Sequence, residues 1–177
     1  PADGPEAGRA IYVHGIAGAR EDGYRHLSLL HKAGWSVLLI GYRNDPGAPA
    51  APEGFHGFGL IEWPDLDAAV DRFSPGPDGP GLLVVADSMG GAIRGRFLAQ
   101  SPLADRVSAV ALDSPALSFR SVLRHLAGQS GHRLPAATAP IAGMLVPRMT
   151  TLPLDKAEVA GVYAGFAGPL FLAHGAG

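Results

Sequence analysis

The sequence Leu82-Leu-Val-Val-Ala-Asp-Ser-Met-Gly-Gly91 decides the fold of this chain. The apolar run 82–86 is typical of a strand buried on both faces, and a helix-compatible segment, 89–99, follows almost at once. Ser88 must therefore lie at a sharp corner between strand and helix. Such a corner has room only for small residues two positions before and after its tip, where the sequence has Ala86 and Gly90. The pattern predicts that the Ser88 hydroxyl projects from the carboxyl edge of a sheet and acts as a nucleophile.

Two other interpretations of this corner need to be weighed. A carboxylate can also be a nucleophile, but Asp87 would have the bulky Val85 and Met89 at the flanking positions. The corner therefore favours Ser88, although Ala86 stands where the G-x-S-x-G pattern has its first glycine. The second interpretation stays open at this point: Asp87 or Ser88 could simply cap the following helix, since both residue types are common N-caps.

Composition excludes several classes of function. With 177 residues, of which 47% are hydrophobic and 17% charged, the chain is long enough for one domain with a real core. A net charge of −2 gives no basis for attraction to nucleic acid, and the absence of cysteine excludes disulfides and thiolate chemistry. No apolar run approaches the roughly 20 residues of a membrane span. The histidines are scattered without a metal-ligand spacing, so we expect no metal, no cofactor and no nucleic-acid partner.

Five short apolar runs alternate with longer segments of mixed or amphipathic character. This alternation predicts an α/β fold with a mostly parallel, doubly wound sheet and crossover helices. The predicted strands are 10–13, 36–40, 82–86, 107–112 and 170–173, and helices are predicted around 24–30, 63–73 and 89–99. We expect residues 1–177 to form a single, incomplete domain. The proline-rich segment 114–168 is expected to be a lid or a long crossover, with one helix over 119–126.

A serine that attacks a carbonyl group creates an oxyanion, which two preorganised backbone N–H groups commonly stabilise. The N–H of Met89 is the first candidate. The second should come from a glycine-containing loop after an earlier strand, and His14-Gly15-Ile16 directly follows the first predicted strand. We assign the Ile16 N–H as the second donor, with His14 and Gly15 shaping the loop. The alternative is that His14 is only a buried histidine at a strand end and Gly15 an ordinary turn residue.

Taken in order, these features resemble the α/β-hydrolase fold, and most of all its bacterial serine hydrolases. The resemblance rests on His14-Gly15, the loop 41–45, the corner 87–91 and the segments 112–115 and 169–175. It implies Ser88 as the nucleophile and the N–H groups of Ile16 and Met89 as the oxyanion donors. It gives the loop 41–45 no chemical role.

The resemblance also implies a catalytic triad in the order serine, acid, histidine. The acid is expected a few residues after the pair His174-Gly175 and the histidine later still, so both would lie beyond Gly177. His174 matches the turn after the last strand rather than the base, and Asp113 could orient a base, as in some relatives. We therefore expect the chain to be incomplete at both ends and nearly inactive on its own.

The leading interpretation is a serine hydrolase that cleaves a carboxylic ester, or a thioester or amide, of a small acyl substrate. The alternative is a non-catalytic domain that keeps the same fold for binding. A nucleotide-binding domain is disfavoured because the sequence has neither G-x-G-x-x-G after the first strand nor G-x-x-x-x-G-K-[ST].

Overall fold

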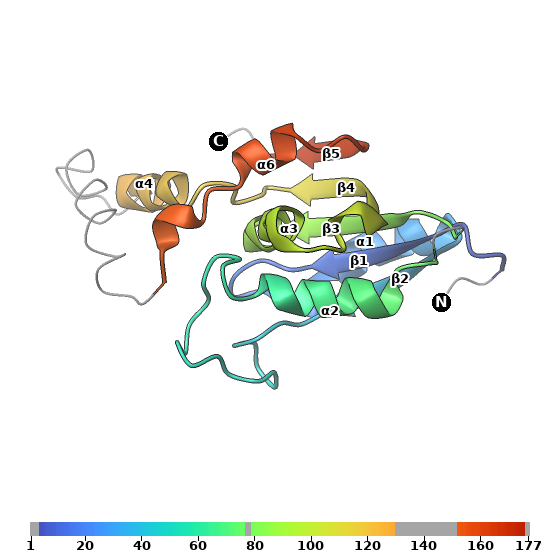
Figure 1. Cartoon of the computed structure of the whole chain (residues 1–177), viewed down its shortest axis with the longest axis horizontal. Coiled ribbons are helices and arrows are strands. Elements are labelled where there is room, and N and C mark those ends of the chain that lie inside the picture. The colour runs from blue at the N-terminus through green and yellow to red at the C-terminus, as the bar shows by residue number, and fades with distance from the viewer. Residues whose placement is uncertain (1–3, 77–78, 130–151, 176–177) are drawn as a thin grey trace.

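The centre of the molecule is a sheet of five parallel strands in the order β2-β1-β3-β4-β5 (Figure 1). It is seen in a computed structural model that describes residues 4–76, 79–129 and 152–175. The strands are β1 (Gly8–Val13), β2 (Trp35–Ile40), β3 (Leu82–Asp87), β4 (Val107–Asp113) and β5 (Leu170–Ala173). All five predicted strands and their parallel arrangement are confirmed.

Helices cover both faces of this sheet. In Figure 1, α2 (Trp63–Phe73) and α3 (Met89–Gln100) lie in front of the strands and α1 (Tyr24–Lys32) lies behind them. Alternate residues of β1 follow this division: Ile11 and Val13 belong to the core cluster shared with α2 and α3. Tyr12 faces the other way, with its ring 5.7 Å from that of His26 in α1. The predicted doubly wound α/β fold is therefore confirmed, as are the helices predicted in these three regions.

The helix α3 is the most enclosed of the described helices, because residues 89–95 and Phe97 are all buried. Small residues allow its neighbours to come this close. A Cβ on Gly95 would lie 2.6 Å from the Cβ of Val159, so only glycine leaves room for that contact. On the same side of the helix, the hydroxyl of Tyr163 in α6 (Ala160–Ala164) donates to the carbonyl of Gly91 over 2.7 Å. The beginning of α3, which follows β3, is thus held in a closely packed position.

The chain between β4 and β5 contains three more of the described helices. The predicted helix over 119–126 is confirmed as α4 (Phe119–Gln129), and η3 (Leu154–Lys156) and α6 follow it. The ring of Phe119 packs edge-on against Phe58 at 5.2 Å, which joins α4 to the loop before α2. Residues 130–151 of the segment 114–168 lie outside the described residues, so the choice between a lid and a long crossover stays a prediction. Two further short helices, η1 (Arg20–Gly23) and η2 (Ala104–Arg106), complete the described elements.

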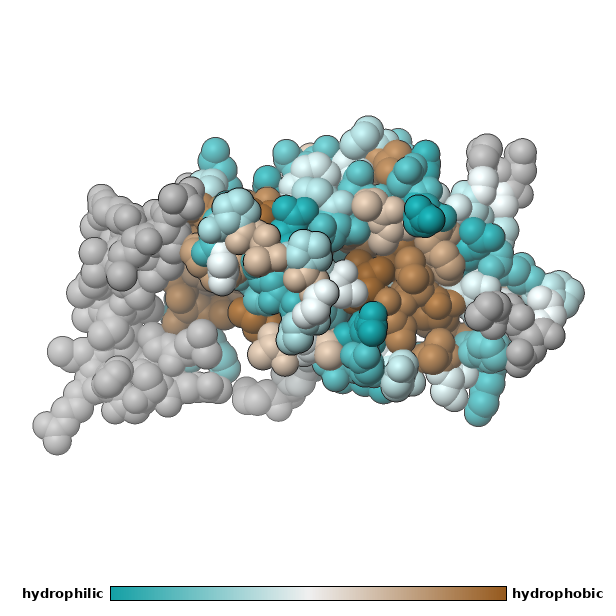
Figure 2. All heavy atoms as spheres, turned by 90° about the horizontal axis from the view of Figure 1, so that it is seen from below, coloured by the Kyte–Doolittle hydropathy of each residue, from teal (hydrophilic) through white to brown (hydrophobic). Residues whose placement is uncertain are grey.

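Both edge strands leave apolar side chains accessible. Figure 2 looks at the molecule from the side of β2, where apolar side chains gather among hydrophilic ones; Val37, Leu38 and Leu39 of β2 are only half-buried. At the opposite edge, the exposed residues of β5 include Phe171, at 66%. Within the described residues, no helix combines the length and the hydropathy that crossing a membrane requires.

Candidate active site

The corner after β3 consists of one residue. β3 ends at Asp87 and α3 begins at Met89, and Ser88 between them has φ 46° and ψ −116°. This is a conformation that non-glycine residues seldom adopt. Hydrogen bonds hold it in place: the N–H of Ser88 donates to Asp113 at 3.1 Å, and its carbonyl accepts from Gly91 at 3.0 Å and Ala116 at 2.8 Å. The sharp strand-to-helix corner predicted at Ser88 is present in the structure.

The structure also tests the alternative that Asp87 or Ser88 simply caps α3. Ser88 occupies the N-cap position of α3, but its side chain makes no capping hydrogen bond. The side chain of Asp87 is 10% exposed and is bound to Tyr12 and Arg25, so it caps nothing either. Helix capping therefore does not explain why these two residues stand here.

Small residues are needed beside the corner, as the sequence predicted. Ala86 is completely buried. A Cβ on Gly90 would lie 2.3 Å from the carbonyl oxygen of Val13 and 2.9 Å from that of His14. Only glycine at this position lets the first turn of α3 lie against the end of β1.

The loop after β1 comes directly to Ser88. A Cβ on Gly15 would lie 2.8 Å from the Cβ of Ser88 and 3.4 Å from its Oγ, so the two residues are in close contact. Ile16, next in the loop, is 55% exposed, whereas Met89 is buried. The residues predicted for the site, Ser88, Ile16 and Met89, thus come from two segments that meet at the carboxyl edge of the sheet.

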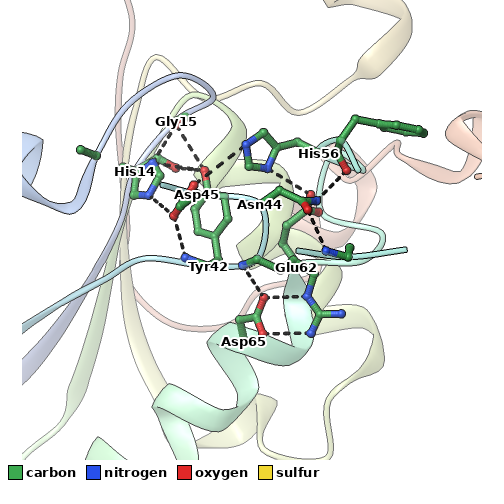
Figure 3. Close-up of polar contacts among 12 residues, drawn as sticks. His14, Gly15, Tyr42, Asn44, Asp45, His56, Glu62 and Asp65 are labelled. Atoms are coloured by element: carbon green, nitrogen blue, oxygen red, sulfur yellow. Dashed lines mark hydrogen bonds and ion pairs between the residues drawn. The ribbon is translucent and has the colours of Figure 1, made fainter. Parts of the chain in front are cut away.

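Behind this loop lies a buried polar network that joins the ends of β1 and β2 (Figure 3). The ring of His14 is 1% exposed and stacks on the ring of Tyr42 at 4.4 Å. Its Nε2 lies 2.9 Å from Asp45 Oδ2, and its Nδ1 lies 2.8 Å from the carbonyl oxygen of Gly15. The loop 41–45, for which the sequence predicts no chemical role, thus has a structural one, because Tyr42 and Asp45 hold His14. The alternative that His14 is a buried, hydrogen-bonded histidine describes its side chain well.

The network continues into the loop before α2. The carboxylate of Glu62 is completely buried and accepts hydrogen bonds from the N–H groups of Gly57 at 2.5 Å and Gly59 at 2.8 Å. His56 lies between the two carboxylates, 3.7 Å from Glu62 and 3.9 Å from Asp45 (Figure 3). Glu62 thereby fixes the loop that packs against α3, where a Cβ on Gly59 would lie 2.6 Å from the carbonyl oxygen of Ala92.

A second polar cluster lies on the α1 face, below Asp87. Tyr12 Oη donates to Asp87 over 2.5 Å, and Arg25 bridges Asp87 and Asp113, at 3.3 Å from the latter. Burial, followed by the hydrogen bond to Asp87, raises the pKa of Tyr12, so its hydroxyl stays protonated. Oxygen and nitrogen atoms of His26, Asp87 and Asp113 lie within 4.8 Å of one another, close enough to share a metal ion. Arg25 already contacts all three residues, since its Nε also donates to His26 at 3.0 Å. The guanidinium thus supplies the positive charge of this cluster.

No family model and no curated protein matches this sequence, but solved structures resemble its fold. A soluble variant of monoglyceride lipase from Saccharomyces cerevisiae, in complex with a substrate analogue, superimposes with a TM-score of 0.64 at 16% identity over 98% of this chain. An esterase from Pyrococcus furiosus gives 0.63 at 20% identity over 95%. Est1E from Butyrivibrio proteoclasticus, with ferulic acid bound, gives 0.56 at 18% identity over 70%.

The chain has the α/β-hydrolase fold. It spans 70%, 61% and 49% of the lengths of these three proteins, respectively. The predicted fold class is confirmed, including its resemblance to esterases and lipases. At these identities the similarity extends to the fold alone.

Within the part of this α/β-hydrolase fold that the structure describes, no histidine is hydrogen-bonded to Ser88 Oγ. His14 and His26 are engaged in the two polar clusters, and the Nδ1 of exposed His174 is 2.9 Å from the carbonyl oxygen of Gly175. The assignment of the base therefore stays a prediction. His132 lies outside the described residues.

Proposed function

We propose that this protein is a serine hydrolase that cleaves the carboxylic ester of a small acyl substrate through an acyl-enzyme on Ser88. The observation that carries the proposal is the position of Ser88. It is a single residue at φ 46° between a buried parallel strand and a buried helix, with its side chain against Gly15. The strain alone does not single out Ser88, since Ser114 has nearly the same φ; the direct passage into α3 and the contact with Gly15 do. The esterases and lipases that share the fold add support.

The backbone N–H groups of Met89 and Ile16 are the proposed oxyanion donors. Met89 is the first residue of α3, where N–H groups have no acceptor within the helix and the helix dipole favours negative charge. Ile16 follows Gly15, whose contact with Ser88 brings this peptide to the same place. Donors from two separately fixed segments suit a charge that develops only in the transition state.

The proposed reaction has two steps. Ser88 Oγ attacks the carbonyl carbon, the bond from this carbon to the alcohol oxygen breaks, and the alcohol leaves with the proton that Ser88 gave to the base. Water then attacks the acyl-enzyme and gives a proton to the base, the bond from the carbonyl carbon to Oγ breaks as Oγ takes that proton, and the carboxylic acid is released. The same site would accept a thioester or an amide. We assign the base, and the acid that orients it, to positions outside the described residues.

The second candidate is a non-catalytic domain that keeps the fold for binding. It is favoured by one observation: no described histidine is hydrogen-bonded to Ser88, and a serine without a base is a weak nucleophile. The two candidates differ in whether the Ser88 hydroxyl reacts.

A fluorophosphonate probe tests the proposal on the whole protein that the gene encodes. We expect labelling that Ser88→Ala abolishes and Ser114→Ala leaves intact. Ser114 is a matched control, because it follows the paired strand β4 and has nearly the same φ, 45°. Absence of labelling would favour the binding domain, and labelling that persists in Ser88→Ala would show that another residue is the nucleophile. Turnover of a short p-nitrophenyl ester by residues 1–177 alone tests the expectation that the base lies beyond Gly177, and brisk Ser88-dependent turnover would refute it.

A further inference from the structure

We propose that His14 and Tyr42, held by Asp45, are positioning residues that set the direction of the Ile16 N–H. The inference rests on the proposed function, in which that N–H is an oxyanion donor. It gives a role to a buried cluster that the reaction itself does not touch. The geometry that carries it is the set of donors around the carbonyl oxygen of Gly15 (Figure 3).

Three donors surround this oxygen. His14 Nδ1 lies 2.8 Å away, the N–H of Gly18 lies 3.1 Å away, and Tyr42 Oη lies 3.2 Å away. The Tyr42 hydroxyl also lies 3.1 Å from the carbonyl oxygen of His14 and 3.2 Å from His14 Nδ1, so it contacts both the backbone and the ring that shape this loop. Together these donors turn the Gly15 carbonyl toward the buried side of the loop.

The direction of one carbonyl determines the direction of the next N–H. The C=O of Gly15 and the N–H of Ile16 belong to one planar peptide group, and this peptide is trans. In a trans peptide the two bonds point to opposite sides. Because the carbonyl faces the buried cluster, the Ile16 N–H faces the open side of the loop, where Ile16 itself is 55% exposed and Gly15 touches Ser88.

The donors are themselves held rigidly. His14 and Tyr42 are 1% and 2% exposed, and their rings stack with an interplanar angle of 17°. Asp45 Oδ2 accepts from His14 Nε2 at 2.9 Å and from the N–H of Tyr42 at 2.7 Å. Both ring nitrogens of His14 thus lie within hydrogen-bond distance of a fixed oxygen atom, one of Gly15 and one of Asp45. Burial, followed by the charges of Asp45 and Glu62, raises the pKa of Tyr42, so its hydroxyl keeps the proton that it donates.

The test is Tyr42→Phe in the whole protein, which removes the hydroxyl and keeps the ring stacked on His14. We expect kcat for a p-nitrophenyl ester to fall about tenfold, less than the roughly 100-fold loss that follows removal of a whole oxyanion donor. KM should change little, because an oxyanion donor acts on the transition state. Tyr24→Phe is the matched control, since Tyr24 is 59% exposed, and it should leave kcat unchanged.

The outcomes separate this inference from the proposed function. If native protein reacts at Ser88 and Tyr42→Phe has native kcat, the positioning role is wrong and the hydrolase stands. If native protein never reacts at Ser88, the proposed function fails and the positioning role fails with it. Should Tyr42→Phe not fold, NMR of the native protein decides. A His14 Nδ1–H protected from exchange supports the inference, and a ring without a proton on Nδ1 overturns it.

Discussion

Gly90→Ala tests whether the close approach of α3 to β1 builds the corner at Ser88. The added Cβ would lie 2.3 Å from the carbonyl oxygen of Val13, where ordinary contact begins at 3.4 Å. Helix or strand must therefore move by about 1 Å, since both partners are backbone and neither can rotate away. Overpacking of this kind costs about 3 kcal/mol at its upper end. The higher helix propensity of alanine offsets about 1 kcal/mol, which leaves a net loss of about 2 kcal/mol.

For a chain of this length, such a loss lowers the midpoint of thermal unfolding by about 4–8 °C. Circular dichroism measures it, with Gly161→Ala in α6 as the matched control. A Cβ on Gly161 meets nothing within 4 Å, so this variant should gain up to about 1 kcal/mol and melt slightly higher than native. The reasoning is refuted if Gly90→Ala melts at or above the native temperature. If Ser88 is the nucleophile, Gly90→Ala should also slow its labelling, because the shift moves the Met89 N–H.

Two further predictions concern buried ionisable groups. Burial is the largest cause that raises the pKa of three tyrosines, so they stay protonated in the folded chain while an unfolded tyrosine ionises near pH 10. Unfolding then releases protons, so the free energy of unfolding should fall as pH rises above about 10. Urea denaturation at pH 8 and pH 11 measures this change. Equal stability at the two pH values would contradict the prediction. The tyrosines are Tyr12, Tyr42 and Tyr163. Arg94 is fully buried, burial lowers its pKa to about 10, and its guanidinium has no hydrogen-bond acceptor among the described residues. Arg94→Met removes this buried charge, so the variant should unfold at the same or a higher urea concentration than the native protein. A clear loss of stability would contradict this. It would show that the contact of the guanidinium with the ring of Phe166, at 4.7 Å, outweighs the cost of burying the charge.

The strands and the corner could be predicted from the sequence because local patterns determine them. A strand buried on both faces needs a continuous apolar run, and 82–86 provides one beside the small residues that the turn requires. The contact between Gly15 and Ser88 was also predictable in outline. Parallel strands end at the same edge of a sheet, and the residues after β1 and β3 are therefore neighbours.

The polar clusters could not be predicted, because each depends on register and on elements far apart in the chain. His14 meets Asp45 because Val13 is paired with Ile40, which brings the segments after β1 and β2 side by side. Nothing in the sequence around Asp45 marks it as the partner of a histidine 31 residues earlier. Arg25 reaches Asp87 only because α1 packs on that face of the sheet, and the spacing of apolar residues says nothing about where an arginine on its surface will bind.

Backbone strain alone does not identify a reactive serine in this chain, and the comparison of Ser88 with Ser114 shows why. The two residues follow paired aspartates at the ends of β3 and β4, and their φ angles are 46° and 45°. Each donates its N–H to the next strand, at 3.1 Å and 2.8 Å. What differs is the surroundings. Ser88 runs directly into a helix of twelve residues and touches Gly15, whereas Ser114 is exposed and precedes Pro115, which has no N–H to offer an oxyanion. The neighbouring donors, rather than the strained turn, therefore make Ser88 the candidate nucleophile.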